Sequence, residues 1–211
     1  MGRNSRVPRK TEGHAPSVAA AFDELRFGRE NTLDLRSSLP TGAEAVRRLE
    51  AFLRERQMAK AAEMLVVTGR GNQSVDRVPI VRPAVATALG RLRRLGVVAS
   101  WQEHTPGSFV VTPAAITALF EAPRRHGDRE QAVVVDAEEF VGLTSETRLA
   151  LRQLAIRALQ GLGVPADEGF VLNEMQRQFS ALGRSIQAGP DRDARLRAAA
   201  ESARDELDAA E

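Results

Sequence analysis

The stretch VVTGRGNQS, residues 66 to 74, carries an apolar run into two glycines that flank an arginine. A glycine-rich loop after a strand can hold a phosphate group on its backbone N–H groups, so a nucleotide site is the first candidate. A Walker loop needs a Lys-Ser or Lys-Thr pair behind its second glycine, which this chain lacks. A dinucleotide site needs a third glycine where Ser74 stands and a helix that opens at once, which Pro79 and Pro83 delay. The loop fits neither pocket.

Composition excludes several other chemistries. The chain has 211 residues, enough for one sizeable core, and no cysteine, which excludes disulfides, thiolate catalysis and cysteine-ligated zinc. Three histidines, His14, His104 and His126, show no metal-ligand spacing. We therefore expect no metal site and no cofactor. No apolar run reaches the roughly 18 residues of a membrane span, and the basic N-terminus lacks the apolar part of a signal peptide. We expect a cytoplasmic protein without membrane contact.

Charge is unevenly distributed along the chain. The net charge of +2 divides into +2 for residues 1–28, +5 for residues 29–113 and −5 for residues 114–211. The basic middle section predicts a surface for a polyanion such as nucleic acid. Arginine outnumbers lysine in acidic and basic sections alike, so the choice of arginine does not by itself indicate a phosphate partner.

Apolar patterning in the basic section predicts alternating strands and helices. Thr41 and Glu44 form the start signal of a helix whose apolar residues recur at helical spacing. Gly96 is placed to end a second helix. Such an order is typical of an α/β layer. The predicted elements are a strand at 31–36, a helix at 41–58, a strand at 64–69, a helix from between Pro79 and Pro83 to Leu95, and two strands around a turn at 105–108.

The two ends of the chain differ from this layer. Residues 1–28 lack periodicity and predict a flexible basic segment. Residues 122–130 read as a polar hinge, and 131–211 as a mainly helical C-terminal extension. The last helix has only a thin apolar seam, which predicts packing on a partner or on its own domain, or fraying. The seam residues are Leu196, Ala200, Ala203 and Leu207.

The order of these motifs resembles the Smr domain, the small MutS-related module. LDLR at 33–36 stands where the family reads LDLHG, and VVTGRGNQS stands at its TGxG or HGxG loop followed by a serine. The resemblance covers residues 30–112 and implies a domain at 29–121. It also implies a compact βαβαββ layer, similar to the C-terminal domain of bacterial translation initiation factor three. Family members bind nucleic acid, and many nick or cleave DNA or RNA, including messenger RNA on stalled ribosomes.

The resemblance makes the glycine loop a nucleic-acid contact. Gly69 and Gly71 let the backbone turn sharply and approach a phosphodiester, while Arg70 between them meets its charge. Asn72 and Ser74 either add hydrogen bonds to phosphate or ribose, or only close the turn. The family's second glycine-rich turn is reduced to Pro-Gly-Ser. The implied contact residues are Arg36, Thr68, Gly69, Arg70, Gly71, Asn72, Ser74 and Gly107.

The first motif departs from the family where chemistry would occur. LDLH places an aspartate and a histidine on one face of a strand, and histidine exchanges a proton near neutral pH. Here the two positions are Asp34 and Arg36, and arginine stays protonated, so it cannot act as a base. This change favours binding over cleavage. The remaining catalytic candidates are Asp34 and His104, although His104 also fits an ordinary surface position in a hairpin.

We therefore predict an Smr-domain protein that binds the phosphate backbone of RNA or DNA, with the choice between the two left open. One alternative is a metal-independent endonuclease that uses Asp34, Arg70 and His104. Another is an interaction module whose acidic C-terminal helices dock a protein partner or the ribosome.

Overall fold

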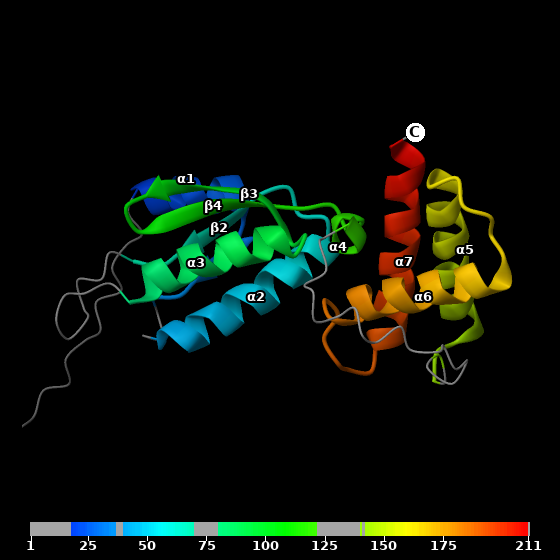
Figure 1. Ribbon diagram of the computed structural model, residues 1–211. Coiled ribbons are helices and arrows are strands. Elements are labelled where there is room, and N and C mark those ends of the chain that lie inside the picture. The colour runs from blue at the N-terminus through cyan, green and yellow to red at the C-terminus, as the bar shows by residue number, and fades with distance from the viewer. Residues whose placement is uncertain (1–17, 37–39, 70–79, 122–139, 141, 211) are drawn as a thin grey trace, which may run out of the picture.

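The computed structural model describes residues 18–36, 40–69, 80–121, 140 and 142–210. A layer of strands and helices stands beside a group of C-terminal helices, as the sequence predicted (Figure 1). We call residues 18–113 the sheet layer, and helices α5 to α7 the helical unit. Among the described residues, no helix is long and apolar enough to cross a membrane.

The sheet has four strands in the order β1-β2-β4-β3. Strand β1 (Thr32–Asp34) is parallel to β2 (Met64–Val67). Strand β4 (Ser108–Pro113) is antiparallel to both β2 and β3 (Val98–Thr105). In this register the carboxyl ends of β1 and β2 lie beside the β3–β4 turn. We call this edge the rim; its described residues are 34–36, 67–69 and 105–108.

Helices α2 (Gly42–Met58) and α3 (Val81–Arg94) cover one face of the sheet (Figure 1). The Thr41 hydroxyl accepts a hydrogen bond from the Glu44 N–H at 3.2 Å, which confirms the predicted N-cap. Gly96 follows α3 with φ of 71°, and a Cβ there would lie 2.2 Å from the Ala118 carbonyl oxygen. The core between helices and sheet is apolar; among its residues are Leu49, Leu53, Val66, Leu89, Leu92 and Val111.

Helix α1 (Val18–Phe27) corrects the prediction that residues 1–28 are flexible. Phe27 is buried with Leu65 and Val110 on the sheet face opposite α2 and α3. The helix was missed because its burial depends mainly on that one contact, which leaves little apolar periodicity in the sequence. Residues 1–17 lie outside the described part of the chain.

The C-terminal residues form α4 (Ala118–Glu121), α5 (Ser145–Gly161), α6 (Glu168–Gly183) and α7 (Arg192–Ala209). Helix α7 packs on α5, with Leu196, Ala200 and Ala203 buried. The predicted apolar seam therefore packs within its own chain. The predicted hinge at 122–130 lies outside the described residues.

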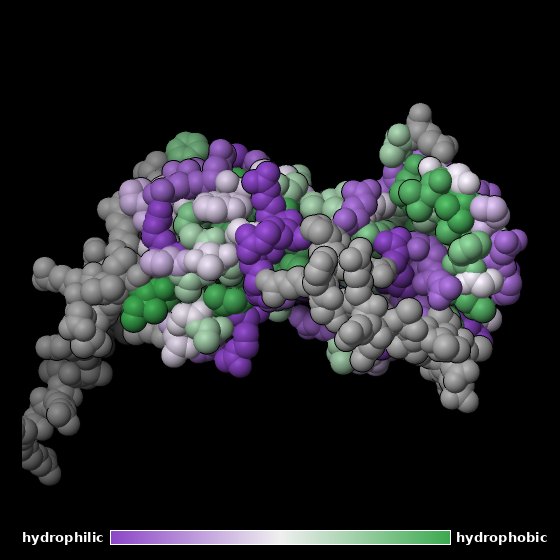
Figure 2. Space-filling view, in the orientation of Figure 1, coloured by the Kyte–Doolittle hydropathy of each residue, from purple (hydrophilic) through white to green (hydrophobic). Residues whose placement is uncertain are grey.

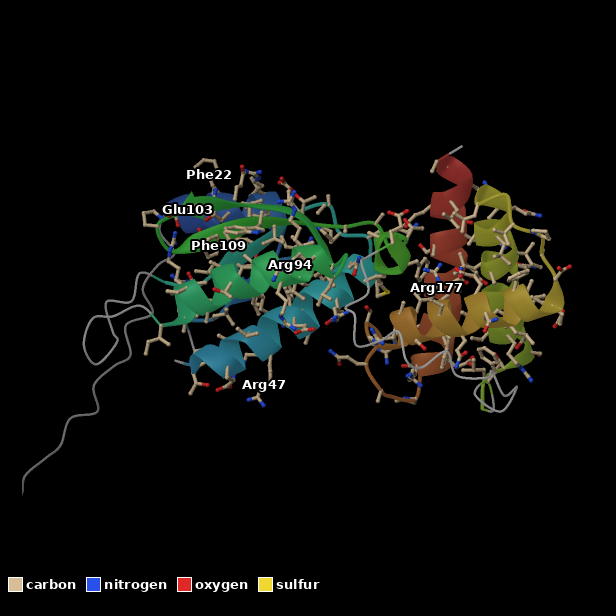
Figure 3. All side chains as sticks on the ribbon, in the orientation of Figure 1. Phe22, Arg47, Arg94, Glu103, Phe109 and Arg177 are labelled. Atoms are coloured by element: carbon tan, nitrogen blue, oxygen red, sulfur yellow. The ribbon has the colours of Figure 1, made fainter. Side chains whose placement is uncertain are left out.

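The sheet layer and the helical unit are joined through the connecting segment 114–121. Ile116, just beyond β4, is fully buried in the core of the helical unit. Gln57, at the end of α2, donates through Nε2 to the carbonyl oxygens of Gly96 and Ala115, at 2.8 and 3.1 Å. Arg177 reaches from α6 to the Phe120 carbonyl oxygen at 2.6 Å (Figure 3). Figure 2 shows hydrophilic side chains gathered over the end of the layer that faces the helical unit.

Candidate nucleic-acid interface

The start of the glycine loop is fastened to the β3–β4 turn at the rim. The backbone N–H groups of Thr68 and Gly69 both donate to the Gly107 carbonyl oxygen, at 2.8 and 3.0 Å. The Thr68 hydroxyl donates to the same oxygen at 3.2 Å. The structure thus brings together two predicted contact motifs that are almost 40 residues apart in the sequence. These two amides are already used, so Thr68 and Gly69 shape the rim and do not offer N–H groups to a ligand.

Glycine is favoured at two of these positions, by a positive φ at Gly69 and by a close backbone approach at Gly107. Gly69 has φ of 75°, in the left-handed region, and a Cβ there would lie 3.2 Å from Arg36 Cγ. A Cβ on Gly107 would lie 3.2 Å from the carbonyl carbon of Gly69. The three motifs of the sequence therefore pack in contact with one another, with the aliphatic part of Arg36 over Gly69.

Asp34 and Arg36 form an ion pair at the end of β1. Arg36 Nη2 lies 2.7 Å from Asp34 Oδ2, and Nε lies 3.1 Å from Oδ1. The Arg36 backbone N–H also donates to Oδ1, at 2.8 Å. Burial raises the pKa of Asp34, but the hydrogen bonds from Arg36 outweigh it and hold the pKa below its ordinary value. Asp34 is therefore ionised at neutral pH and a weak proton acceptor.

The Arg36 guanidinium still faces solvent, with 60% of its side chain exposed. Its contacts with Asp34 use Nε and Nη2, and the structure gives Nη1 no partner among the described residues. A phosphate oxygen can therefore reach Nη1 without breaking the ion pair. Arg36 is a predicted contact residue whose geometry suits an anion, although Asp34 offsets part of its charge.

His104 lies away from Asp34. Its Nε2 is 2.9 Å from Asp23 Oδ1, and its ring packs edge-on against Phe27, with centroids 6.1 Å apart. Strands β1 and β3 are opposite edges of a four-stranded sheet, so the two candidates are separated by roughly 14 Å at ordinary strand spacing. The structure does not bring the proposed catalytic pair to one phosphodiester. Asp23 was not considered in the sequence because α1 itself was missed.

Arg82 of α3 contacts the rim and was not singled out from the sequence. It donates to the Pro106 carbonyl oxygen at 2.8 Å and pairs with Glu103 at 2.7 Å. Its guanidinium also stacks over the Phe109 ring, 4.9 Å from the centroid. Arg82 lies in the first turn of α3, where the helix dipole disfavours a cation. A cation at such a position indicates that contacts from outside the helix hold it. Arg82 therefore fixes the turn that carries Gly107.

The first turns of two helices also lie beside the rim. Helix α2 follows the end of β1, and a Cβ on Gly42 would lie 3.5 Å from Ile80, next to the start of α3. Both helices thus begin at the same end of the layer (Figure 1). Helix N-termini carry partial positive charge and N–H groups without intrahelical partners, which favours anions nearby.

Four predicted contact residues lie outside the described part of the chain: Arg70, Gly71, Asn72 and Ser74. Within the described part, no group of three or more histidine, aspartate or glutamate residues is arranged to hold a metal ion.

A family model matches the part of the chain that contains the rim. The model of the Smr domain matches residues 33–112. Residues 33–112 are an Smr domain. The match begins in LDLR and ends in β4, so α1 and the helical unit lie outside it. Smr domains are linked to nucleic-acid binding and nuclease activity. No curated protein and no solved structure matches the chain significantly.

Proposed function

We propose that this Smr domain binds the sugar-phosphate backbone of RNA or DNA at the rim, and that its first motif serves binding and not cleavage. The observation that carries the proposal is the ion pair at the end of β1. Arg36 stands where the family has a histidine, and it holds Asp34 through both its guanidinium and its backbone N–H. The pair supplies a directed cation and no group that exchanges a proton at neutral pH.

Cleavage requires a proton acceptor near the attacking oxygen. Asp34 has a lowered pKa and is occupied by Arg36. His104 contacts Asp23 on the far strand of the sheet. Neither supports hydrolysis at the rim, whereas the exposed Arg36 and the nearby starts of α2 and α3 favour an anion there.

Two substitutions test the proposal, and they are expected to change the affinity for nucleic acid in opposite directions. Arg36→Ala removes the cation and leaves Asp34 unpaired, so it weakens affinity for labelled single-stranded RNA or DNA. We expect a loss of about fivefold near 0.1 M salt and a salt slope lower by about 0.7, the value for one contact on a single strand. Asp34→Asn keeps an oxygen for the Arg36 N–H but removes the negative charge, so affinity rises. Fluorescence anisotropy over a salt series measures both.

Arg148→Ala is the matched control for the loss of a cation, because Arg148 is an exposed arginine of α5 in the helical unit. If Arg36→Ala binds as this control does, the rim is not the contact. The same labelled strands are followed for cleavage. Cutting by the wild-type protein that Asp34→Asn abolishes, with the fold intact by circular dichroism, supports the endonuclease and overturns the binding-only function.

A further inference from the structure

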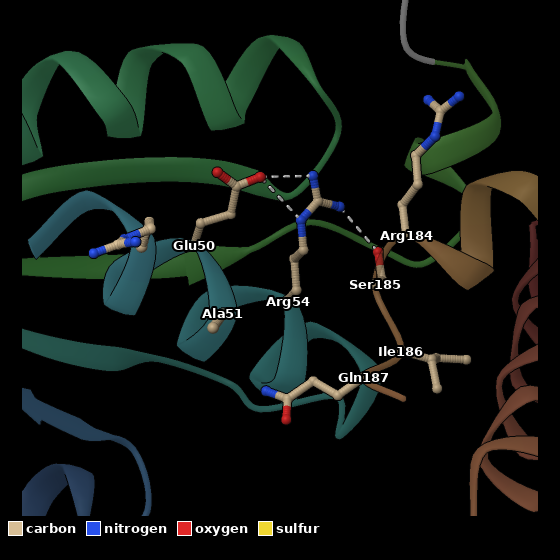
Figure 4. Close-up of a pocket in the computed structure, with 8 residues that line it drawn as sticks. Glu50, Ala51, Arg54, Arg184, Ser185, Ile186 and Gln187 are labelled. Atoms are coloured by element: carbon tan, nitrogen blue, oxygen red, sulfur yellow. Dashed lines mark hydrogen bonds and ion pairs between the residues drawn. The ribbon is translucent and has the colours of Figure 1, made fainter. Parts of the chain in front are cut away.

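A shallow cleft lies where the sheet layer meets the helical unit (Figure 4). Its wall on the Smr side is α2, which contributes Arg47, Glu50 and Arg54. Its other wall is the loop between α6 and α7, which contributes Arg184 and Ser185. The cleft thus joins an element of the family domain to a segment outside the family match.

One carboxylate serves two guanidinium groups in this cleft. Arg54 contacts Glu50 Oε1 at 3.0 Å and the Ser185 hydroxyl, also at 3.0 Å. Arg91 of α3 contacts the other oxygen of Glu50 at 2.6 Å. The bridge from Arg54 to Ser185 holds the two walls together and is seen in Figure 4. The floor of the cleft is therefore fixed, and its single acid is fully used.

Two further arginines of the cleft have no such partner. Within the part of the chain that the structure describes, neither Arg47 nor Arg184 has a carboxylate within ion-pair distance, and both are exposed. Arg47 points out from α2 into solvent (Figure 3). The residues that line the cleft include three arginines and one glutamate, a formal charge of +2, and Arg91 adds a further cation behind Glu50. An excess of this size without internal compensation favours a polyanionic ligand.

Arg184 is notable because it lies in the acidic part of the chain. Two acids of the helical unit on α6 are engaged by arginines of the same unit: Glu168 pairs with Arg152, and Glu174 with Arg177. The loop that faces α2 instead presents a free cation. At Arg184 the helical unit therefore extends the basic surface of the Smr domain, although residues 114–211 have a net charge of −5.

Helix α2 connects the cleft to the rim. It begins at Gly42 beside the rim, and Arg54 lies 12 residues further along. At 1.5 Å per residue this is about 18 Å. A nucleic-acid duplex advances about 3.4 Å per phosphate along one strand, so about five phosphates span that distance. One strand can contact the rim and the cleft together.

We propose that the cleft binds backbone phosphates of the same nucleic acid that the rim binds, so that the α6–α7 loop is the second half of the binding surface. This inference rests on the proposed function of the rim. It assigns Arg47 and Arg184 to phosphate contact, and Arg54 and Glu50 to positioning the two walls.

The test compares the full-length wild-type chain with the double variant Arg47→Ala/Arg184→Ala. Affinity is measured over a salt series for a duplex of about 20 base pairs and for one of about 4 base pairs whose strands are covalently linked, the shorter being unable to span the 18 Å. For the long duplex we expect affinity about sixtyfold lower near 0.1 M salt and a slope lower by about 1.8, which is two phosphate contacts. For the short duplex we expect a clearly smaller loss, because it reaches Arg47, about 7.5 Å along α2 from Gly42, but not the α6–α7 loop.

The matched control is Arg93→Ala/Arg148→Ala, which removes one exposed arginine from α3 and one from α5, both outside the cleft. Thermal unfolding of both double variants checks that the fold is unchanged. If the cleft variant equals this control on the long duplex while Arg36→Ala still weakens binding, the inference fails and the proposed function stands. Equal losses of affinity for the long and the short duplex would contradict the proposal that one strand contacts the rim and the cleft together. If the wild-type chain binds neither RNA nor DNA, both proposals fail.

Discussion

Arginines of the Smr domain and of the helical unit illustrate two kinds of pairing. In the helical unit, Arg152 and Arg177 close ion pairs with acids of the same unit, at Glu168 and Glu174. In the Smr domain, Arg54 and Arg91 share one carboxylate, Glu50, and Arg36 keeps an open side toward solvent. The net charge of a segment therefore says little about where cations are available. Pairing in three dimensions decides that.

The apolar cores of the two regions also differ in which parts of the chain build them. The core of the Smr domain comes from its own strands and helices. The core of the helical unit includes Ile116, which follows directly after the last strand of the sheet. Gln57 adds polar contacts between the end of α2 and the same connecting segment. The helical unit is thus built onto the Smr domain and is not merely tethered to it.

The largest effect is expected from Ile116→Ala, which tests whether the two cores depend on each other. Ile116 is fully buried, so its truncation should cost about 2–5 kcal/mol of unfolding free energy. Urea unfolding followed by circular dichroism measures the loss. Leu149→Ala, at a side chain that is 56% exposed on α5, is the control and should change stability by less than about 0.5 kcal/mol. Similar small losses for both variants would mean that the helical unit does not need the connecting segment.

A smaller loss is expected from Gly96→Ala, which probes the contact between the end of α3 and α4. Gly96 has positive φ, and an added Cβ would collide with the Ala118 carbonyl oxygen. The left-handed conformation alone costs an alanine about 1–2 kcal/mol, so we expect roughly 2 kcal/mol or more with the collision. Gly90→Ala, inside the same helix and with no atom within 4 Å of its added Cβ, should stabilise by about 1 kcal/mol. Thermal unfolding measures both variants, and melting temperatures of Gly96→Ala and Gly90→Ala that shift in the same direction would contradict the prediction.

The smallest effect is expected from Glu50→Gln, which sharpens the comparison of charge. Burial raises the pKa of Glu50, but hydrogen bonds from Arg91 and Arg54 outweigh it, so the pKa lies below its ordinary value. A lowered carboxyl pKa stabilises the folded state above the unfolded value, about 4.3, and this contribution disappears as the pH falls through the folded value.

Wild-type stability should therefore fall more steeply than that of Glu50→Gln below about pH 4.3. At neutral pH the variant should lose less than about 1 kcal/mol, because solvent screens a partly exposed ion pair. It should also bind a long duplex more tightly, since the cleft gains net positive charge. Parallel acid-unfolding curves for the two proteins would show that Glu50 does not link α2 to α3.

Much of the fold was predictable because its signals are local. The cap at Thr41, the apolar stripe of α2 and the glycine after α3 each depend on a few neighbouring residues, and each is confirmed. The order of the motifs indicated the Smr family, and the family match over residues 33–112 confirms that resemblance. Helix α1 was missed because its main anchor, Phe27, is buried by strands that are distant in the sequence.

The candidate site likewise has features that were predicted and features that were not. The family resemblance implied that Arg36, Gly69 and Gly107 belong to one surface, and the structure brings them into contact. The sequence did not predict that Arg36 would hold Asp34, that His104 would contact Asp23, or that the Gly107 carbonyl would take the Thr68 and Gly69 amides. In each case several polar partners are available, and only the distances between side chains in the folded protein decide which pair forms.

The sequence by itself determined the secondary structure of the Smr domain and the residues of its motifs, because periodicity, caps and glycine positions act over a few residues of chain. Tertiary structure alone decided which cations stay available, at Arg36, Arg47 and Arg184, and where the α6–α7 loop meets α2. The physical reason is that an ion pair depends on the distance between two side chains in space, whereas a sequence records only their separation along the chain.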